Sequence, residues 1–248
     1  MFRLLSIFGL LAVLSACGQA KLDGVDSAVT GGSSSDAVNA ATPVAQTSPS
    51  APSVSKAPEV KASSSKTFVA GKDYRVLDRP IPTANPNKVE IAEFFWYGCS
   101  HCYSFEPAIK EYKSSAPDFI EVVPVPTVWR KSMEIHAKAF YAAKLLKKPE
   151  LHDAIFKAMN VDGNRLADSM AVAALFEQHG VDKKDTLKLL KSFGVNSLVN
   201  KANSLSAGAK IAGTPTLVVN GKYVVESRLA GSQRRMLEIA DYLAKKEK

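Results

Sequence analysis

The chain has 248 residues, of which 46% are hydrophobic and 23% charged. A length of this order suits one globular domain of about 150–200 residues with additional segments, and such a domain folds without metal or disulfide crosslinks. Only three cysteines are present, which excludes a small disulfide-crosslinked scaffold. The net charge of +8 is compatible with nucleic-acid binding, but the lysines are scattered and no RNA- or DNA-reading motif occurs, so we expect no nucleic-acid partner.

The first sixteen residues have the pattern of a bacterial signal peptide. Arg3 is followed by an apolar run over residues 4–14, which is too short to span a bilayer. Small residues then precede Cys17, as in a lipobox, so we expect lipidation of Cys17 and a membrane anchor. An ordinary cleaved signal peptide is the alternative. The residue after Cys17 is Gly18 rather than the Asp that retains lipoproteins in the inner membrane, which slightly favours the outer membrane.

A low-complexity segment over residues 17–66 follows the signal peptide. It is rich in Ser, Ala, Pro, Thr and Gly, contains no aromatic residue, and carries equal numbers of acidic and basic side chains. Such a composition cannot bury enough apolar surface to offset the entropy of ordering. We expect a flexible tether that reaches about 40 Å from the anchor.

Residues 67–131 contain the first sheet-forming part. Residues 89–97 are β-branched and aromatic and apolar on both faces, which is typical of a buried central strand. Gly98 ends this strand, a helical pattern follows over residues 100–115, and a second strand is expected at residues 120–125. This order predicts a right-handed βαβ unit.

Residues 132–212 change to helical periodicity and form an expected helical insertion. Gly180 and Gly194 are placed where helix C-caps favour a positive φ. The expected helices cover residues 133–146, 150–159, 169–179, 183–193 and 196–211.

The last part, residues 213–248, returns to strands. Asn220 and Gly221 separate two β-rich runs, residues 216–219 and 223–226, which is a strong hairpin signal. A final helix is expected over residues 233–246. Together the segments predict an α/β fold in which a helical insertion divides two sheet-forming halves.

Cys99 and Cys102 form a CxxC pair at the junction of the buried strand and the following helix. The spacing places both sulfur atoms at the first helical turn, close enough to form a disulfide. The helix N-terminus and His101 favour a thiolate, mainly at Cys99, and a stabilised thiolate makes the disulfide easy to pass on. We therefore predict a redox-active pair.

Two other interpretations of the CxxC pair are weaker. A zinc site needs four ligands, but there is no second CxxC and the four histidines lack ligand spacing with this pair, so we expect no metal. A purely structural disulfide would close too short a loop to restrain the unfolded chain much. No signal for another cofactor is present.

The CxxC segment resembles the DsbA family of periplasmic protein-thiol oxidants. The similarity covers about residues 68–246 and rests on two motifs in the expected order, EFFWYGCSHCYSFEP over residues 93–107 and GTPT followed by VNGKY over residues 213–223. The resemblance implies a thioredoxin fold with an inserted helical domain. It implies that Cys99 is the nucleophile, that Cys102 is the buried resolving thiol, and that Pro215 is cis with Thr214 presenting its backbone to the substrate.

Glu93 lies in the apolar strand six residues before Cys99. A carboxyl group there would be desolvated, with a raised pKa, and could transfer the proton of Cys102. A hydrogen-bonded structural acid is the alternative. Two departures from the family pattern leave the redox potential open: Ser100 replaces a proline, and residues 120–128 contain no basic side chain.

The expected activity is donation of the Cys99–Cys102 disulfide to reduced, unfolded envelope proteins, with a DsbB-type membrane oxidase restoring it. A monomer tethered in the periplasm through Cys17 fits this activity. The alternatives are a disulfide reductase or isomerase, and a non-catalytic lipoprotein that binds metal or a partner. The low-complexity tether stands where isomerase relatives carry a dimerisation domain, which favours the oxidant.

Overall fold

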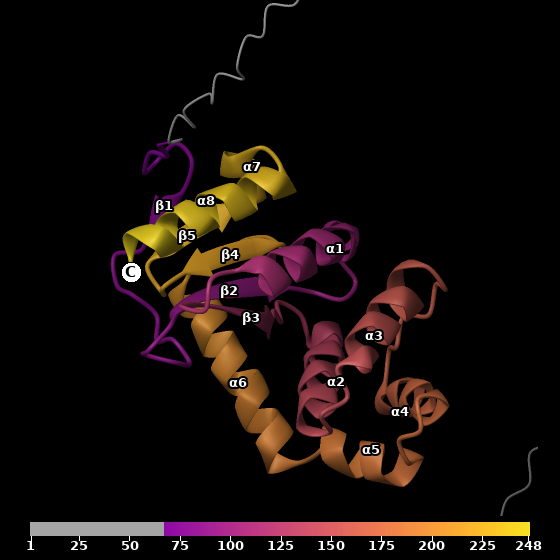
Figure 1. The fold of residues 1–248 in the computed structure, drawn as a ribbon. Helices are drawn as coiled ribbons and strands as arrows, with labels where there is room; N and C mark the ends of the chain where they lie inside the picture. Colours follow the sequence, from indigo (N-terminus) through magenta and orange to yellow (C-terminus); the bar gives the residue numbers. More distant parts are fainter. Residues whose placement is uncertain (1–66) are drawn as a thin grey trace, which may run out of the picture. The chain divides into compact units, whose positions relative to one another are not determined.

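A five-stranded mixed β-sheet organises residues 67–248, the part of the chain that the structure describes. In this computed structural model the strands lie in the order β1-β5-β4-β2-β3 (Figure 1). The predicted signal peptide, Cys17 and the tether lie outside the described residues. The strands are β1 (Arg75–Val76), β2 (Val89–Phe95), β3 (Ile120–Pro126), β4 (Thr216–Val219) and β5 (Tyr223–Glu226).

Strand β2 has the central position that its composition predicts. It pairs parallel with β3 and antiparallel with β4, and all seven of its residues are buried. It ends at Phe95, two residues earlier than expected, because Trp96 and Tyr97 already belong to the loop that leads to Cys99. The buried strand thus delivers this loop to the start of helix α1 (Ser100–Ser115).

Strand β3 forms one edge of the sheet, and its sequence limits further pairing there. The N–H of Val89 donates to Phe119 O and the N–H of Thr127 donates to Phe95 O, so odd-numbered residues of β3 direct their backbone groups toward β2. The even-numbered residues point to the open edge, and two of them are Pro124 and Pro126. Because proline has no N–H, neither position can donate to an added strand.

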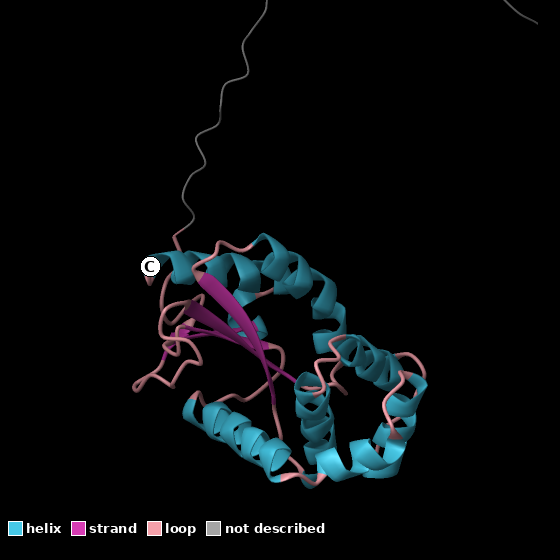
Figure 2. Cartoon of the chain, turned by 60° about the horizontal axis from the view of Figure 1, so that its bottom comes forward, coloured by secondary structure: helices cyan, strands magenta, loops and turns pink. Residues whose placement is uncertain are grey.

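Helices cover both faces of the sheet (Figures 1 and 2). Helices α1 and α8 (Gln233–Lys246) contact each other and cover one face, where Phe105, Met236 and Ile239 pack in one cluster with Ile91 and Leu217 of the sheet. Helices α2 and α6 contact β3 and each other. Their buried residues join Phe94 in a second cluster. The βαβ unit and the α/β class predicted from the sequence are confirmed.

The helical insertion lies between β3 and β4. The bounds agree with the expected helices to within a few residues, with one exception at the junction of the last two. Here Ser192 Oγ accepts a hydrogen bond from the N–H of Val195 and caps α6, so Gly194 lies in the first turn of a helix. The expectation that Gly194 ends a helix with positive φ is therefore wrong, whereas Gly180 has φ 74° as expected. A short 3₁₀ turn (Lys131–Met133) leads into α2 (Glu134–Leu145), α3 (Glu150–Asn160), α4 (Ser169–Gln178), α5 (Lys183–Leu190) and α6 (Phe193–Gly208).

The predicted hairpin joins β4 and β5. Asn220 and Gly221 both have positive φ, at 49° and 64°. A side chain at Gly221 would place Cβ 2.1 Å from the carbonyl oxygen of Ile81, so the close approach also requires glycine. Strand β1 and the short helix α7 (Ser227–Ala230), which follows β5, are not predicted by the sequence pattern.

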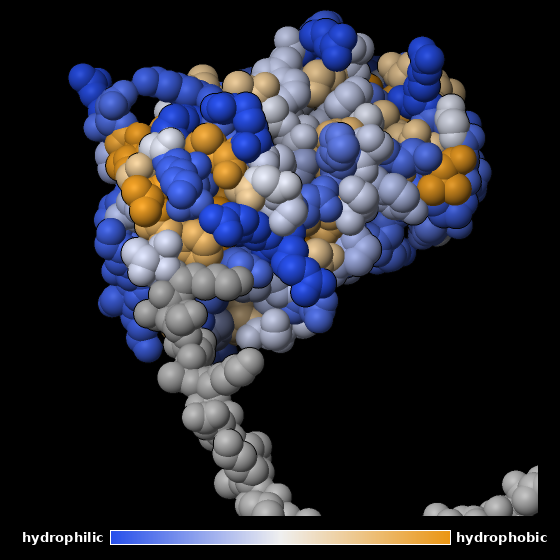
Figure 3. Space-filling view, turned by 90° about the horizontal axis from the view of Figure 1, so that it is seen from above, coloured by the Kyte–Doolittle hydropathy of each residue, from blue (hydrophilic) through white to orange (hydrophobic). Residues whose placement is uncertain are grey.

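The surface that carries α7 and α8 is mixed in character. Seen from above in Figure 3, hydrophobic residues occur in small groups among hydrophilic ones. Within residues 67–248, every helix is too short or too polar to cross a bilayer.

Candidate active site

Cys99 is the N-cap residue of helix α1, directly after the loop that leaves β2. Its N–H donates to Trp96 O at 3.0 Å, and its carbonyl oxygen accepts from the N–H of Tyr103. The indole of Trp96 covers Gly98, where an added Cβ would lie 2.4 Å from the ring. The tight turn over residues 96–99 therefore needs glycine and holds Cys99 at the helix start.

The surroundings of Cys99 favour its thiolate. The Cys102 thiol donates a hydrogen bond to the Cys99 sulfur and, with smaller contributions from Thr214 and from the N–H groups of Cys102 and His101, lowers the pKa of Cys99 to about 5 despite partial burial. These N–H groups belong to the first turn of α1, where they have no partner within the helix. At neutral pH Cys99 is a thiolate and hence a nucleophile.

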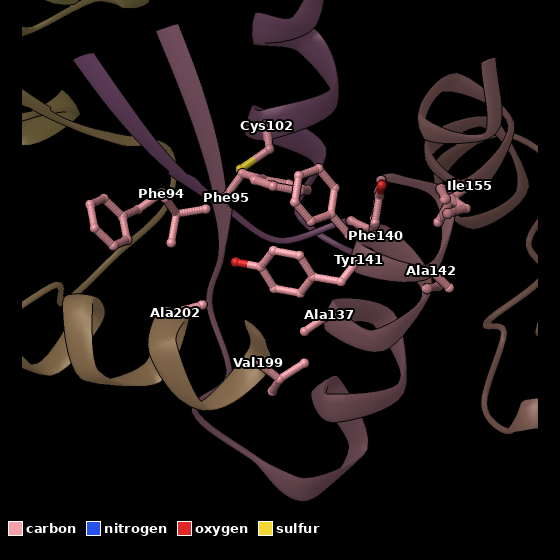
Figure 4. Close-up of a cluster of buried hydrophobic side chains, with 14 of the residues drawn as sticks. Phe94, Phe95, Cys102, Ala137, Phe140, Tyr141, Ala142, Ile155, Val199 and Ala202 are labelled. Atoms are coloured by element: carbon pink, nitrogen blue, oxygen red, sulfur yellow. The ribbon is translucent and has the colours of Figure 1, made fainter. Parts of the chain in front are cut away.

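Cys102 differs from Cys99 in burial and in reactivity. Its side chain is fully buried, and its sulfur points toward Phe95 in the core (Figure 4). The hydrogen bond to Cys99 and burial raise the pKa of Cys102 far above its ordinary value. Both cysteines are free thiols in this structure. Cys99 is the half-buried thiolate, and Cys102 is its buried, protonated partner.

The Thr214–Pro215 segment faces the CxxC pair from the other side of the site. Its peptide bond is cis, the geometry that the family resemblance implies. Cys99 Sγ lies 3.4 Å from the carbonyl oxygen of Thr214. Thr214 lines two hollows of about 300 Å³ and 280 Å³, and the other lining residues include His101 in the first and Arg228 in the second. An extended peptide laid across Thr214 would bring its own sulfur to Cys99.

His101 is exposed between the two cysteines. Its N–H contributes to the lowered pKa of Cys99. Its carbonyl oxygen accepts a hydrogen bond of 2.6 Å from Gln233 Nε2 of α8. Gln233, which the sequence gives no reason to select, thereby fixes the first turn of α1.

Glu93 is buried in the middle of β2, on the face that packs against α1. Burial and the neighbouring Glu106 carboxylate raise the pKa of Glu93 to about 8, although Lys110 and Lys113 oppose the shift. Its Oε1 is one of two buried side-chain atoms within residues 67–248 that lack a hydrogen-bond partner. At neutral pH Glu93 is therefore mainly a protonated acid with a free oxygen, as a proton donor requires.

The structure also shows a chain of polar side chains near Glu93, formed by Glu106, His152 and Tyr97, which the sequence alone did not predict. Cys102 and Glu106 are four residues apart on α1 and therefore share one face of the helix. Glu106 Oε1 lies 3.2 Å from His152 Nε2, and His152 Nδ1 lies 2.7 Å from Tyr97 Oη. The i, i+4 spacing from Cys102 is the signal that could have identified Glu106.

No group of three or more His, Cys, Asp or Glu side chains capable of holding a metal occurs within residues 67–248. The residues brought together at the start of α1 are suited to sulfur chemistry. A thiolate at a helix start, a buried partner thiol three residues later and a cis-proline loop are the parts that disulfide exchange needs.

The comparisons with known proteins give the same answer. The model of the DSBA-like thioredoxin domain matches residues 90–243, more than half of the chain. The chain belongs to the DsbA family. The thioredoxin fold expected from the two sequence motifs is thereby confirmed.

Individual DsbA proteins are similar over most of the domain. The thiol:disulfide interchange protein DsbA of Azotobacter vinelandii is 38% identical over 179 residues, which are 72% of this chain and 84% of that protein. The DsbA of Pseudomonas aeruginosa is 34% identical over 75% of this chain and 89% of its own length. The crystal structure of P. aeruginosa DsbA has a TM-score of 0.69 at 35% identity, covering 73% of this chain and 94% of that one. The solved structure of the oxidoreductase NmDsbA1 from Neisseria meningitidis has a TM-score of 0.64 at 32% identity, covering 72% of this chain and 93% of that one. The predicted protein disulfide oxidoreductase activity is confirmed.

Proposed function

We propose that this DsbA-family oxidoreductase donates the Cys99–Cys102 disulfide to reduced proteins outside the inner membrane. The observation that supports this direction of transfer is the contrast between the two thiols. A Cys99 thiolate with a pKa of about 5 stabilises the reduced form, and whatever stabilises the reduced form makes the disulfide a stronger oxidant.

The proposed reaction has two exchange steps. A substrate thiolate attacks Cys99 Sγ of the disulfide, the Cys99–Cys102 bond breaks, and Cys102 leaves as a thiolate that takes a proton from Glu93. A second substrate thiolate then attacks the substrate sulfur of the mixed disulfide and releases the Cys99 thiolate. Two electrons pass from the substrate to the CxxC pair, and the substrate gains one disulfide.

The substrate segment is proposed to lie across Thr214 and Pro215. The two hollows that Thr214 lines leave room for side chains next to the reacting cysteine. The half-buried Cys99, with Sγ next to Thr214 O, is the sulfur that such a peptide can reach, whereas the buried Cys102 is not. This arrangement supports Cys99 as the nucleophile and Cys102 as the resolving thiol.

The proposal extends to the reoxidation partner and the location. A DsbB-type membrane oxidase would take the two electrons and restore the disulfide. Lipidation of Cys17 would keep the monomeric enzyme in the periplasm, tethered to a membrane, with the outer membrane favoured by the residue after Cys17.

The equilibrium with glutathione tests the direction of transfer. We expect a strongly oxidising Cys99–Cys102 couple and loss of all oxidase activity in Cys99→Ala. A potential as low as that of thioredoxin, about −270 mV, would contradict the oxidant and favour the reductase. Full activity of Cys99→Ala would contradict every catalytic interpretation of the pair.

The anchor requires a separate measurement in a bacterial host. Metabolic labelling with a fatty acid should mark the wild-type chain and leave Cys17→Ala unlabelled, and membrane fractionation should then show which membrane holds the protein. Equal labelling of both chains would contradict lipidation at Cys17.

A further inference from the structure

Two consecutive aromatic residues of the loop before Cys99 are each held by a histidine of the inserted helices. Trp96 Nε1 donates to His136 Nδ1 on α2 at 3.0 Å. Tyr97 Oη lies 2.7 Å from His152 Nδ1 on α3. The two histidines differ in what their other ring nitrogen meets: His136 Nε2 lies 3.0 Å from the carbonyl oxygen of Arg165, whereas His152 Nε2 lies 3.2 Å from the carboxylate of Glu106.

The hydrogen bonds determine the tautomer of His152. The Glu106 carboxylate can only accept, so the ring hydrogen lies on His152 Nε2, which donates to Glu106 Oε1. In the neutral ring Nδ1 then accepts from the hydroxyl of Tyr97. Tyr97 keeps this proton because burial raises its pKa well above the ordinary value. The ring cannot easily rotate out of this arrangement, because Phe95, Phe140 and Phe156 pack around it with centroids 5.0–5.8 Å away.

The Glu106 carboxylate has a second possible partner, Lys110. Besides the bond to His152, its Oε2 lies 3.5 Å from Lys110 Nζ, on the exposed side of α1, and Lys110 also pairs with Asp153 of α3. Glu106 lines an open cavity of about 1050 Å³ between α1 and the helices α3 and α4. Without the His152 donor, the carboxylate is free to follow Lys110 toward this open cavity.

We propose that His152, held as an N–H donor by Tyr97, is a positioning residue of the redox centre that keeps the Glu106 carboxylate beside Glu93 and away from the open cavity. This inference rests on the proposed role of Glu93 as the proton donor to Cys102. The residue of β3 opposite Glu93 is Pro124, so β3 offers no hydrogen-bond donor or charge to the buried acids Glu93 and Glu106. His152 of the inserted domain supplies such a donor, to Glu106.

The consequence of this arrangement is electrostatic. The charged groups that act on Glu93 all come from α1: Glu106 raises its pKa, and Lys110 and Lys113 lower it. Its partners across the sheet, Pro124 and Leu217, carry no charge. Movement of the Glu106 carboxylate away from Glu93 therefore lowers the pKa of Glu93, and the group then loses the proton that Cys102 needs.

The test is a titration of the Glu93 carboxyl group in the purified protein, followed by NMR of ¹³C-labelled glutamate and assigned with Glu93→Gln. We expect Glu106→Gln to raise the acid dissociation constant of Glu93 about tenfold. His152→Leu should change it in the same direction by at least half as much on the logarithmic scale. His152→Gln, which offers an amide N–H, should restore part of the wild-type value.

The matched control for His152→Leu is His136→Leu. It removes the acceptor of the Trp96 hydrogen bond but makes no contact with Glu106, so Glu93 should titrate as in the wild type. If His152→Leu does not fold, Tyr97→Phe replaces it, because loss of the hydroxyl releases the tautomer while the ring remains.

Three outcomes would overturn the inference: no shift in Glu106→Gln, no shift in the His152 and Tyr97 variants, or an equal shift in His136→Leu, which would indicate general loosening of the loop. Disulfide exchange of the wild-type protein with glutathione is measured on the same samples. Its failure would contradict the proposed function, whereas exchange that persists without any dependence of Glu93 on His152 contradicts the positioning role alone.

Discussion

Replacement of Cys102 by alanine should weaken the thiolate at Cys99. The hydrogen bond from the Cys102 thiol is the largest contribution that lowers the pKa of Cys99 to about 5. A hydrogen bond to a charged group contributes about 1.5–3 kcal/mol, and one pKa unit corresponds to about 1.4 kcal/mol. Without this donor the pKa of Cys99 should therefore rise to about 6–7. The ultraviolet absorbance of the thiolate, followed against pH, measures this directly because only one thiol of the pair then remains.

Cys102→Ser is the matched control for this titration. Its hydroxyl retains a donor three residues after Cys99, so most of the shift should persist. A pKa that stays near 5 in Cys102→Ala would refute the reasoning, because the helix start and Thr214 would then suffice to hold the thiolate.

The pKa of Cys99 also determines the expected redox potential of the pair. At pH 7 a Cys99 pKa of about 5 instead of the ordinary 9 favours the thiolate by about 2.7 kcal/mol. For a two-electron couple this corresponds to roughly 60 mV in the oxidising direction. Above about pH 6 Cys99 should also react with alkylating agents at an almost constant rate, whereas the rate of an ordinary thiol would still rise up to about pH 9.

Two further predictions concern stability. Gly221→Ala should lower the free energy of unfolding, measured by urea denaturation, by more than about 2 kcal/mol, because Cβ would meet Ile81 O. Gly163 has a similar φ but open space around it, so Gly163→Ala should lower the free energy of unfolding by only about 1 kcal/mol. Equal losses in the two variants would contradict the role of the contact with Ile81. Burial would raise the pKa of Glu247, but hydrogen bonds from Lys222 and its neighbours hold it at about 2. Its contribution is complete above pH 4.5 and is lost as the pH falls toward 2. In Glu247→Gln the free energy of unfolding should no longer fall in this way between pH 4.5 and 2. A pH profile identical to that of the wild type would contradict the contribution of Glu247.

Local sequence patterns were sufficient for the elements that carry the cysteines. The apolar run of β2, the helical spacing after Gly98 and the Asn220–Gly221 turn gave element bounds that the structure matches closely. These signals work because each depends on residues that are neighbours in the chain. Strand β1 has only two residues and exists through its pairing with β5, so it leaves no periodicity to detect.

The failure at Gly194 is a matter of competing local signals. Glycine favours helix ends, but Ser192 offers an N-cap two residues earlier and its hydrogen bond to Val195 decides the boundary. At the site, the burial of Glu93 follows from its strand, whereas the contact of Glu106 with His152 joins positions 46 residues apart. Helical spacing shows which face of α3 is buried but does not identify what that face meets.

The two prolines at the open edge of β3 suit an enzyme whose substrates are unfolded proteins. Unfolded clients present extended segments with unpaired backbone groups, and a regular strand edge would bind them indiscriminately and start co-aggregation. With Pro124 and Pro126 at outward positions, the edge cannot offer a continuous ladder. The β3 edge thus favours the proposed binding of clients across Cys99 and Thr214, where exchange would release the bound chain.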